Sequence, residues 1–278
     1  ALLTDASLPE HRGRVFGFHR SLDTLGAFVG LLLALLYLHF FPNQYRSLFL
    51  WAFIPGLFAV LLTFKIKEAI PQSPMPIHRA RMSWRCFWKS TSSRFKLIML
   101  GLSIIACVNS SDMFLLIQAG KMASTPSNTL YLYLWYNLVY TVFAYPLGQL
   151  SDRIGIKPLL LMGYGIMAFV YFAFIGPLSN TALYFVFALY GLYAAATEGL
   201  AKAWISQHCP ADQRGQSLGL LSGIQSVGLL VSGSIYVFFS LINQIHWAFI
   251  ITALGCIVGS LVLSLVQQHT ITNAETKM

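Results

Sequence analysis

The residues best able to do chemistry are a few ionisable and polar side chains inside long apolar stretches. Asp112 is the clearest, because a carboxylate in a membrane-crossing helix costs roughly 2.5 to 3.5 kcal/mol on insertion scales. Asn109 precedes it by one helical turn and Gln118 follows it. This spacing predicts a polar face toward a central cavity, where Asp112 could bind a proton or a cationic group of a solute. The alternative is a hydrogen-bonded residue between packed helices.

Three further polar residues mark faces of other apolar stretches. Asn137 and Tyr140 share a face of the stretch that begins near residue 130, and Gln225 lies on a face of a later one. We expect these side chains to line the same cavity. Isolated polar residues in such helices also bind neighbouring helices by hydrogen bonds, and this remains the competing interpretation.

Two charged pairs lie near the ends of apolar stretches. Glu198 and Lys202 are four residues apart, so their side chains share a helical face and can neutralise each other. Arg20 and Asp23 lie at the mouth of the first stretch. We expect both pairs to belong to a cytoplasmic gate. The alternatives are a structural role or a substrate site for the first pair and side chains that extend to the membrane surface for the second.

The elements that carry these residues are long apolar segments, since 56% of the 278 residues are apolar and 10% are charged. A segment of about 20 residues crosses a hydrocarbon layer of roughly 30 Å as a helix. The predicted spans are residues 21–41, 48–64, 97–118, 130–150, 159–175, 183–205, 218–239 and 247–266. They are too long and too continuously apolar for barrel strands. The predicted fold is therefore an all-α membrane protein with eight transmembrane helices.

Charge placement predicts how these spans are threaded. The net charge is +9, and alternate threading puts every Lys and Arg except Arg46 and Lys121 on one side of the membrane. Positive residues gather in the cytoplasm, so both ends of the chain are predicted to be cytoplasmic. This distribution explains the basic balance without a nucleic-acid partner.

Metal and cofactor chemistry finds no support in the spacing of residues. The four cysteines and seven histidines show no paired spacing for metal ligands or a disulfide. No group of His, Asp, Ser or Cys residues is spaced as membrane-embedded catalysis would need. We therefore expect no metal, no cofactor, no catalytic residue and no enzymatic activity.

An internal repeat divides the chain. Its first copy contains Arg12, Gly13, Gly17 and Gly26, and its second contains Arg214, Gly215, Gly219 and Gly228. The string Trp-Ala-Phe-Ile also recurs, at 51–54 and 247–250. Six spans separate the copies, which predicts two parallel six-helix halves. Residues 1–68 are then the end of an N-terminal half, 69–95 a cytoplasmic central linker, and 96–278 a six-helix C-terminal half.

One loop carries a family signature. Residues 148–158 read Gly-Gln-Leu-Ser-Asp-Arg-Ile-Gly-Ile-Lys-Pro, which resembles the cytoplasmic loop of the major facilitator superfamily. The resemblance implies a bundle of six plus six helices, of which this chain would hold the last eight, with the first four missing. It also implies a cytoplasmic gate, whose loop residues are Gly148, Asp152, Arg153, Gly155 and Lys157.

The resemblance implies contacts for two gate residues. Asp152 would face the start of the first span, near residues 13–17, where unpaired N–H groups attract an anion. Arg153 would approach Glu198. The alternative is that the charges of this loop only anchor it on the cytoplasmic side.

The function implied by the resemblance is secondary active transport of a small solute by alternating access. Its expected partners are that solute, the lipid bilayer and protons as the coupling ion, and the full-length protein would be a monomer. The expected location is a plasma membrane, the bacterial inner membrane. A non-transporting membrane remnant or a membrane interaction protein is the alternative, because the missing helices would supply part of the cavity.

Overall fold

The computed structural model describes residues 7–65, 84–122, 126–210 and 213–266, and these ranges contain helices and no strand. The elements are the 3-10 helix η1 (Pro9–His11) and the helices α2 (Arg12–Phe40), α3 (Tyr45–Thr63), α4 (Trp84–Ser90), α5 (Ser93–Val108), α6 (Asp112–Met122), α7 (Pro126–Ile154), α8 (Ile156–Ala173), α9 (Asn180–Gln207), α10 (Arg214–Leu241) and α11 (Ile245–Ser264). Serine side chains begin two of them, since Ser92 accepts a hydrogen bond from the N–H of Phe95, and Ser179 from that of Ala182.

Within the described ranges, seven helical segments are long and apolar enough to cross a membrane, with α5 and α6 taken together as Ser93–Met122. This confirms the prediction of an all-α membrane protein. The eighth predicted span, 130–150, lies inside α7, which has 29 residues and could reach across by length. The tyrosines and Asn137 of α7 lower its mean hydropathy, which explains why it is not among the seven.

The predicted continuous span 97–118 is broken in the structure. α5 ends at Val108, Asn109 has the extended angles φ −72° and ψ 98°, and α6 begins at Asp112. Neighbouring helices satisfy the carbonyl groups that the break frees. The Ser232 hydroxyl of α10 donates to the Asn109 carbonyl (2.9 Å), and that of Thr252 on α11 donates to the Val108 carbonyl (2.9 Å). A break deep in the bundle is tolerated because protein groups replace the missing bonds.

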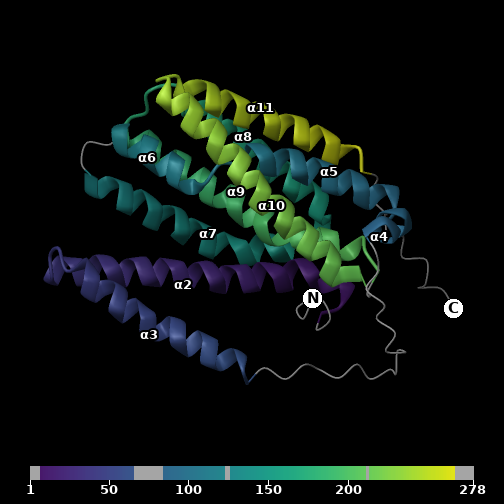
Figure 1. Cartoon of the computed structure of the whole chain (residues 1–278), viewed down its shortest axis with the longest axis horizontal. Coiled ribbons are helices and arrows are strands. Elements are labelled where there is room, and N and C mark those ends of the chain that lie inside the picture. Colours follow the sequence, from purple (N-terminus) through teal and green to yellow (C-terminus); the bar gives the residue numbers. More distant parts are fainter. Residues whose placement is uncertain (1–6, 66–83, 123–125, 211–212, 267–278) are drawn as a thin grey trace.

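α2 lies alongside α7 and also contacts α9 (Figure 1). Glycines bring the backbones of α2 and α7 together. A Cβ atom at Gly148 would lie 2.6 Å from the Gly13 carbonyl oxygen, and one at Gly17 would lie 2.6 Å from that of Ala144. The close approach of these helices therefore requires residues without side chains at the crossing.

A tight turn joins α7 to α8 and sets the place of the loop motif. Gly155 has φ 91°, a left-handed conformation that residues with a side chain rarely adopt, and it alone separates the two helices. The turn places the last residues of α7, including Asp152, beside the start of α2.

The connections α2–α3 and α10–α11 each contain an asparagine with positive φ. Asn43 (φ 64°) and Asn243 (φ 56°) are the two non-glycine residues with positive φ in the described ranges, and each is followed by glutamine. Asparagine is among the residues that tolerate this conformation. The two segments that the internal repeat links thus share this feature, whereas the division of the chain into halves remains a prediction.

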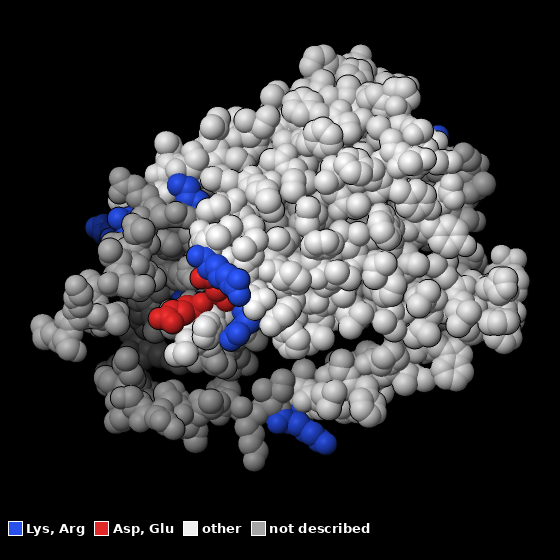
Figure 2. Space-filling view, turned by 180° about the vertical axis from the view of Figure 1, so that it is seen from behind, with Lys and Arg blue, Asp and Glu red and all other residues white. Residues whose placement is uncertain are grey.

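The outer surface suits a lipid environment. On the face that Figure 2 shows, charged side chains gather mainly toward one end, and a broad surface carries none. α3 has no buried residue, and its aromatic side chains are open, with Phe49 74% and Phe58 65% exposed. Large continuous apolar surface of this kind marks contact with membrane or protein rather than with water.

Candidate functional site

A cavity of about 350 Å³ lies among α2, α5, α6, α8, α9 and α10. The predicted site residues that line it are Arg20, Asn109, Asp112, Glu198, Lys202 and Gln225. The structure therefore brings together, around one small space, predicted residues that lie up to 205 positions apart in the sequence (Arg20 and Gln225). Gln118, Asn137 and Tyr140, which were expected to line the cavity, are not among its lining residues.

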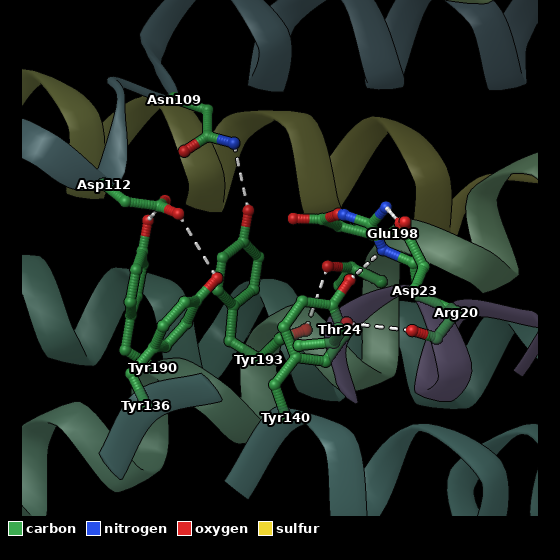
Figure 3. Close-up of polar contacts among 11 residues, drawn as sticks. Arg20, Asp23, Thr24, Asn109, Asp112, Tyr136, Tyr140, Tyr190, Tyr193 and Glu198 are labelled. Atoms are coloured by element: carbon green, nitrogen blue, oxygen red, sulfur yellow. Dashed lines mark hydrogen bonds and ion pairs between the residues drawn. The ribbon is translucent and has the colours of Figure 1, made fainter. Parts of the chain in front are cut away.

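Asp112 begins α6, and both of its carboxylate oxygens accept hydrogen bonds from tyrosines. The Tyr190 hydroxyl donates to Oδ1 (2.7 Å), and the Tyr136 hydroxyl donates to Oδ2 (3.3 Å), as Figure 3 shows. Hydrogen bonds to an ionised acceptor are the stronger kind. The first turn of a helix also favours a negative charge. The break between α5 and α6 thus gives the carboxylate a stabilised position at the cavity wall.

Asn109 lies beside this carboxylate and has one atom without a partner. Its Nδ2 atom donates to the Tyr193 hydroxyl (3.0 Å). Its buried Oδ1 atom has no hydrogen-bond partner in the described structure and is turned away from Tyr193 toward the side of Asp112 (Figure 3). An unsatisfied buried carbonyl oxygen costs free energy, and a bound donor would remove that cost.

The sequence reasoning missed the tyrosines that hold Asp112 and Asn109. Tyr136 of α7 and Tyr190 and Tyr193 of α9 are 4%, 2% and 4% exposed. The rings of Tyr136 and Tyr190 stack with centroids 5.2 Å apart. Their spacing carried a signal, because tyrosines three or four positions apart share a helical face. It could not show that the faces of α7 and α9 meet around Asp112.

Arg20 joins three helices at the other side of the cavity. Its guanidinium donates to Tyr140 of α7, to Glu198 of α9 and, at 2.6 Å, to Asp23 one turn along α2. Arg20 and Asp23 were predicted as a pair, and Glu198 and Tyr140 are additional partners. Tyr140 thus contacts a predicted gate residue, although it does not line the cavity.

Two expected partners of Glu198 are wrong. Its carboxylate binds Arg20, and in the described ranges no ion pair joins it to Lys202 or to Arg153. The side chain of Arg153 is exposed. Lys202 lines the cavity and, among the residues that the structure describes, has no hydrogen bond or ion pair. The i, i+4 spacing placed Lys202 and Glu198 on one face, but Arg20 from α2 offers a fork of donors that Lys202 does not.

The side chain of Asp152, near the end of α7, lies beside the start of α2. Its Oδ1 accepts from the N–H of Gly13 (2.9 Å) and its Oδ2 from the N–H of Arg14 (3.0 Å). Nearby, the Arg12 guanidinium donates to the Ser206 carbonyl (2.9 Å) near the end of α9. The start of α2 is thus held by charge-assisted bonds to α7 and to α9. This is the position that the loop resemblance implied for Asp152, and its role in a gate remains a prediction.

Two other predicted residues donate hydrogen bonds outside the cavity, and the buried Oε1 of a third, Gln118, has no hydrogen-bond partner in the described ranges. Lys157 donates to the carbonyls of Ser264 (2.6 Å) and Val266 (2.7 Å), so it caps the end of α11 rather than contacting α2. Asn137 is buried, and its Nδ2 donates to the Tyr133 carbonyl one turn earlier in α7 (2.8 Å). Gln118 is half-buried in α6.

No three His, Cys, Asp or Glu side chains within the described ranges come together as metal ligands would. The cavity instead offers two carboxylates, an ammonium and a guanidinium, together with hydroxyl and amide groups. Such a set can bind a small polar solute or hold a proton.

Comparison with known proteins identifies a family and a relative. The profile of the Major Facilitator Superfamily matches residues 122–276. A curated relative from Methanocaldococcus jannaschii, described as an uncharacterized MFS-type transporter, is 31% identical over 220 residues. The alignment covers 77% of this chain and 54% of the relative, so the chain spans about half the length of that protein.

Proposed function

This chain belongs to the major facilitator superfamily, and we propose that the protein is a secondary active transporter, which moves a small solute by alternating access. The observation that carries the proposal is the cavity of about 350 Å³ between α2 and five other helices. It contains charged side chains inside a bundle whose outer surface is apolar. Ionisable residues in such a place are costly and mark pathways for solutes or ions.

The contacts of α2 suggest how access to the cavity alternates. Asp152 and Arg12 hold the start of α2 against α7 and α9, and Arg20 holds α2 to α9 about two turns further on. All three contacts join a helix of the predicted N-terminal half to helices of the C-terminal half. Breaking them would let α2 move away and open the cavity on that side. The positive-inside rule supports the assignment of this side to the cytoplasm, and the membrane that we propose is a plasma membrane, the bacterial inner membrane.

Asp112 is the residue that we assign to coupling or to recognition. If it carries a proton, Asp112→Asn abolishes accumulation driven by a pH gradient and leaves exchange of solute across the membrane. If it binds the solute, accumulation and exchange fall together, because a neutral amide no longer attracts a cation. Asn has nearly the same size, so packing against Tyr136 and Tyr190 is kept in both cases.

The direct test reconstitutes the full-length protein in vesicles and measures uptake of radiolabelled amino acids, sugars, organic acids and lipophilic cations, with and without a pH gradient. We expect saturable movement of one class, which Asp112→Asn reduces. Glu10→Gln is the matched control, since Glu10 is exposed and lies outside the cavity. Correctly inserted protein that moves no solute of the panel in either direction would contradict the proposal.

A further inference from the structure

The charged groups around the cavity leave one carboxylate uncompensated. Arg20 binds both Glu198 and Asp23, and Asp23 also attracts the half-buried ammonium of Lys202. The two positive and two negative side chains at this end therefore balance. Asp112 makes no ion pair with any residue that the structure describes. Resting on the proposed transport function, we propose that the solute is a primary ammonium ion with an apolar body, and that its ammonium binds Asp112.

Two tyrosines hold the Asp112 carboxylate without neutralising it. The hydroxyls of Tyr190 and Tyr136 donate to its two oxygens at 2.7 and 3.3 Å, and a hydroxyl brings no positive charge. Each carboxylate oxygen accepts one of these bonds and has a lone pair left for another donor. Uncompensated charge away from water is costly. A primary ammonium supplies the missing positive charge and three N–H donors, so it matches this carboxylate in both respects.

Asn109 adds an acceptor on the same side of the cavity. Its Nδ2 donates to the Tyr193 hydroxyl (3.0 Å), so its Oδ1 is the atom turned toward the side of Asp112 (Figure 3). The partial negative charge of an amide oxygen adds to that of the carboxylate, so this end attracts cations and repels anions. Figure 3 shows Asp112 and Asn109 on one side of Tyr193 and the Arg20–Glu198 pair on the other. The negative end and the balanced end are therefore different parts of the cavity.

The rest of the cavity suits an apolar body without further charge. Its volume of about 350 Å³ is at the lower end of ligand pockets, which favours a small solute. Part of its wall is formed by the aliphatic side chains Leu102, Ile105 and Leu229. A carboxylate on the solute would meet no uncompensated cation, because both basic side chains at the balanced end already face acidic ones. An amino acid is therefore a worse match than the amine that carries the same side chain.

The test measures equilibrium binding of radiolabelled primary amines to the purified full-length protein in detergent. The amines carry alkyl or phenyl bodies of increasing size, so that one unsuitable body does not hide the site. Three relatives of each amine serve as competitors: the alcohol lacks the charge, the trimethylammonium ion lacks the N–H donors, and the α-amino acid adds a carboxylate. Loss of a hydrogen bond to a charged group weakens binding by about 10- to 100-fold. We expect the best amine to compete at least about tenfold better than each of its relatives.

One variant should locate the ammonium. Asp112→Asn should lose the preference for the amine over the alcohol, because the neutral amide attracts the charged solute no better than the uncharged one. Glu10→Gln removes the charge of an exposed carboxylate outside the cavity and should keep the preference. An Asp112→Asn protein that unfolds at the same temperature as the parent and still prefers the amine would overturn the assignment of the ammonium to Asp112.

The outcomes for the parent protein need no variant and separate this inference from transport itself. Equal competition by the amine and its alcohol, tighter binding of the amino acid, or no binding of any amine in the series would each overturn the ammonium site. These results would leave the transporter in place if vesicles that contain the protein move a sugar or an organic acid. An amine that binds but is not moved by the inserted protein would overturn the transport function and leave the ammonium site.

Discussion

Replacing Asp152 by asparagine should weaken the contact between the start of α2 and α7. The native carboxylate accepts from the N–H groups of Gly13 and Arg14 at 2.9 and 3.0 Å. Asparagine keeps one acceptor oxygen but turns an NH₂ group toward the other N–H, so one bond is lost and a donor faces a donor. The negative charge at the start of the helix is lost as well.

The size of this effect follows from the two contributions. A hydrogen bond to a charged group contributes about 1.5 to 3 kcal/mol. A charge at a helix N-terminus contributes about 0.3 to 1 kcal/mol. Because Asp152 is only half-buried, the lower part of the combined range, about 2 to 3 kcal/mol, applies. The closed arrangement of α2 should then lose about 30- to 150-fold in its equilibrium with an open one.

The assay follows the access of water-soluble reagents to the cavity. Ala201 lines the cavity and is 2% exposed, so Ala201→Cys in a full-length protein without its native cysteines reports on opening. An impermeant maleimide, applied from the side on which Asp152 lies, should label the Asp152→Asn variant at least about tenfold faster. Arg153→Gln is the matched control, because it changes the adjacent, exposed charge. Equal labelling rates for Asp152→Asn and the parent, at equal membrane levels, would refute the reasoning.

Three further substitutions test contacts within the bundle, each by thermal unfolding in detergent. Gly148→Val should lower stability by about 1 to 3 kcal/mol, because its Cβ would lie 2.6 Å from the Gly13 carbonyl, whereas Gly165→Ala, in open space, should change little. Arg20→Gln should cost about 1 to 3 kcal/mol, less than a fully buried pair because the side chains are 30% and 38% exposed; adding Glu198→Gln should restore part of the loss, and additive losses would argue against the ion pair. Lys157→Gln should lower the melting temperature, because the end of α11 loses its hydrogen bonds to Lys157. It should not change the rate at which the maleimide labels the Ala201→Cys variant, and faster labelling would show that Lys157 acts in the gate.

The sequence predicted the helices and the membrane-protein class, because both depend on local runs of residues. The apolar runs predicted an all-α membrane fold, because a helix is the structure that satisfies the backbone of a long apolar segment in lipid. The break at Asn109 was missed, because hydropathy averages over a window and hides a short polar interruption. The run Asn-Ser-Ser-Asp at 109–112 consists of residues that favour helix starts, and it was the signal available.

Contacts between distant helices were predicted only where a family resemblance supplied them. The loop resemblance correctly predicted that Asp152 lies beside the start of α2. The same resemblance paired Arg153 with Glu198, whereas in the structure Glu198 pairs with Arg20. Periodicity shows which residues share a face of a helix, but not which neighbour that face meets. The tyrosines around Asp112 and the partner of Glu198 depend on such neighbours, so they became visible only with the packed structure.

The break between α5 and α6 places Asn109 and Asp112 both at the proposed solute site and at a point where the bundle can bend. α5 packs mainly against α10 and α11, whereas α6 packs mainly against α7. If α7 moves relative to α10 and α11, the non-helical residues 109–111 between α5 and α6 are one place that can absorb the displacement, together with the stacked Phe114 and Tyr236 that join α6 to α10. Asn109 lies in this non-helical joint and Asp112 directly follows it. A solute held by these two residues would stiffen the joint, so occupancy of the cavity would itself change how easily the two sets of helices turn against each other.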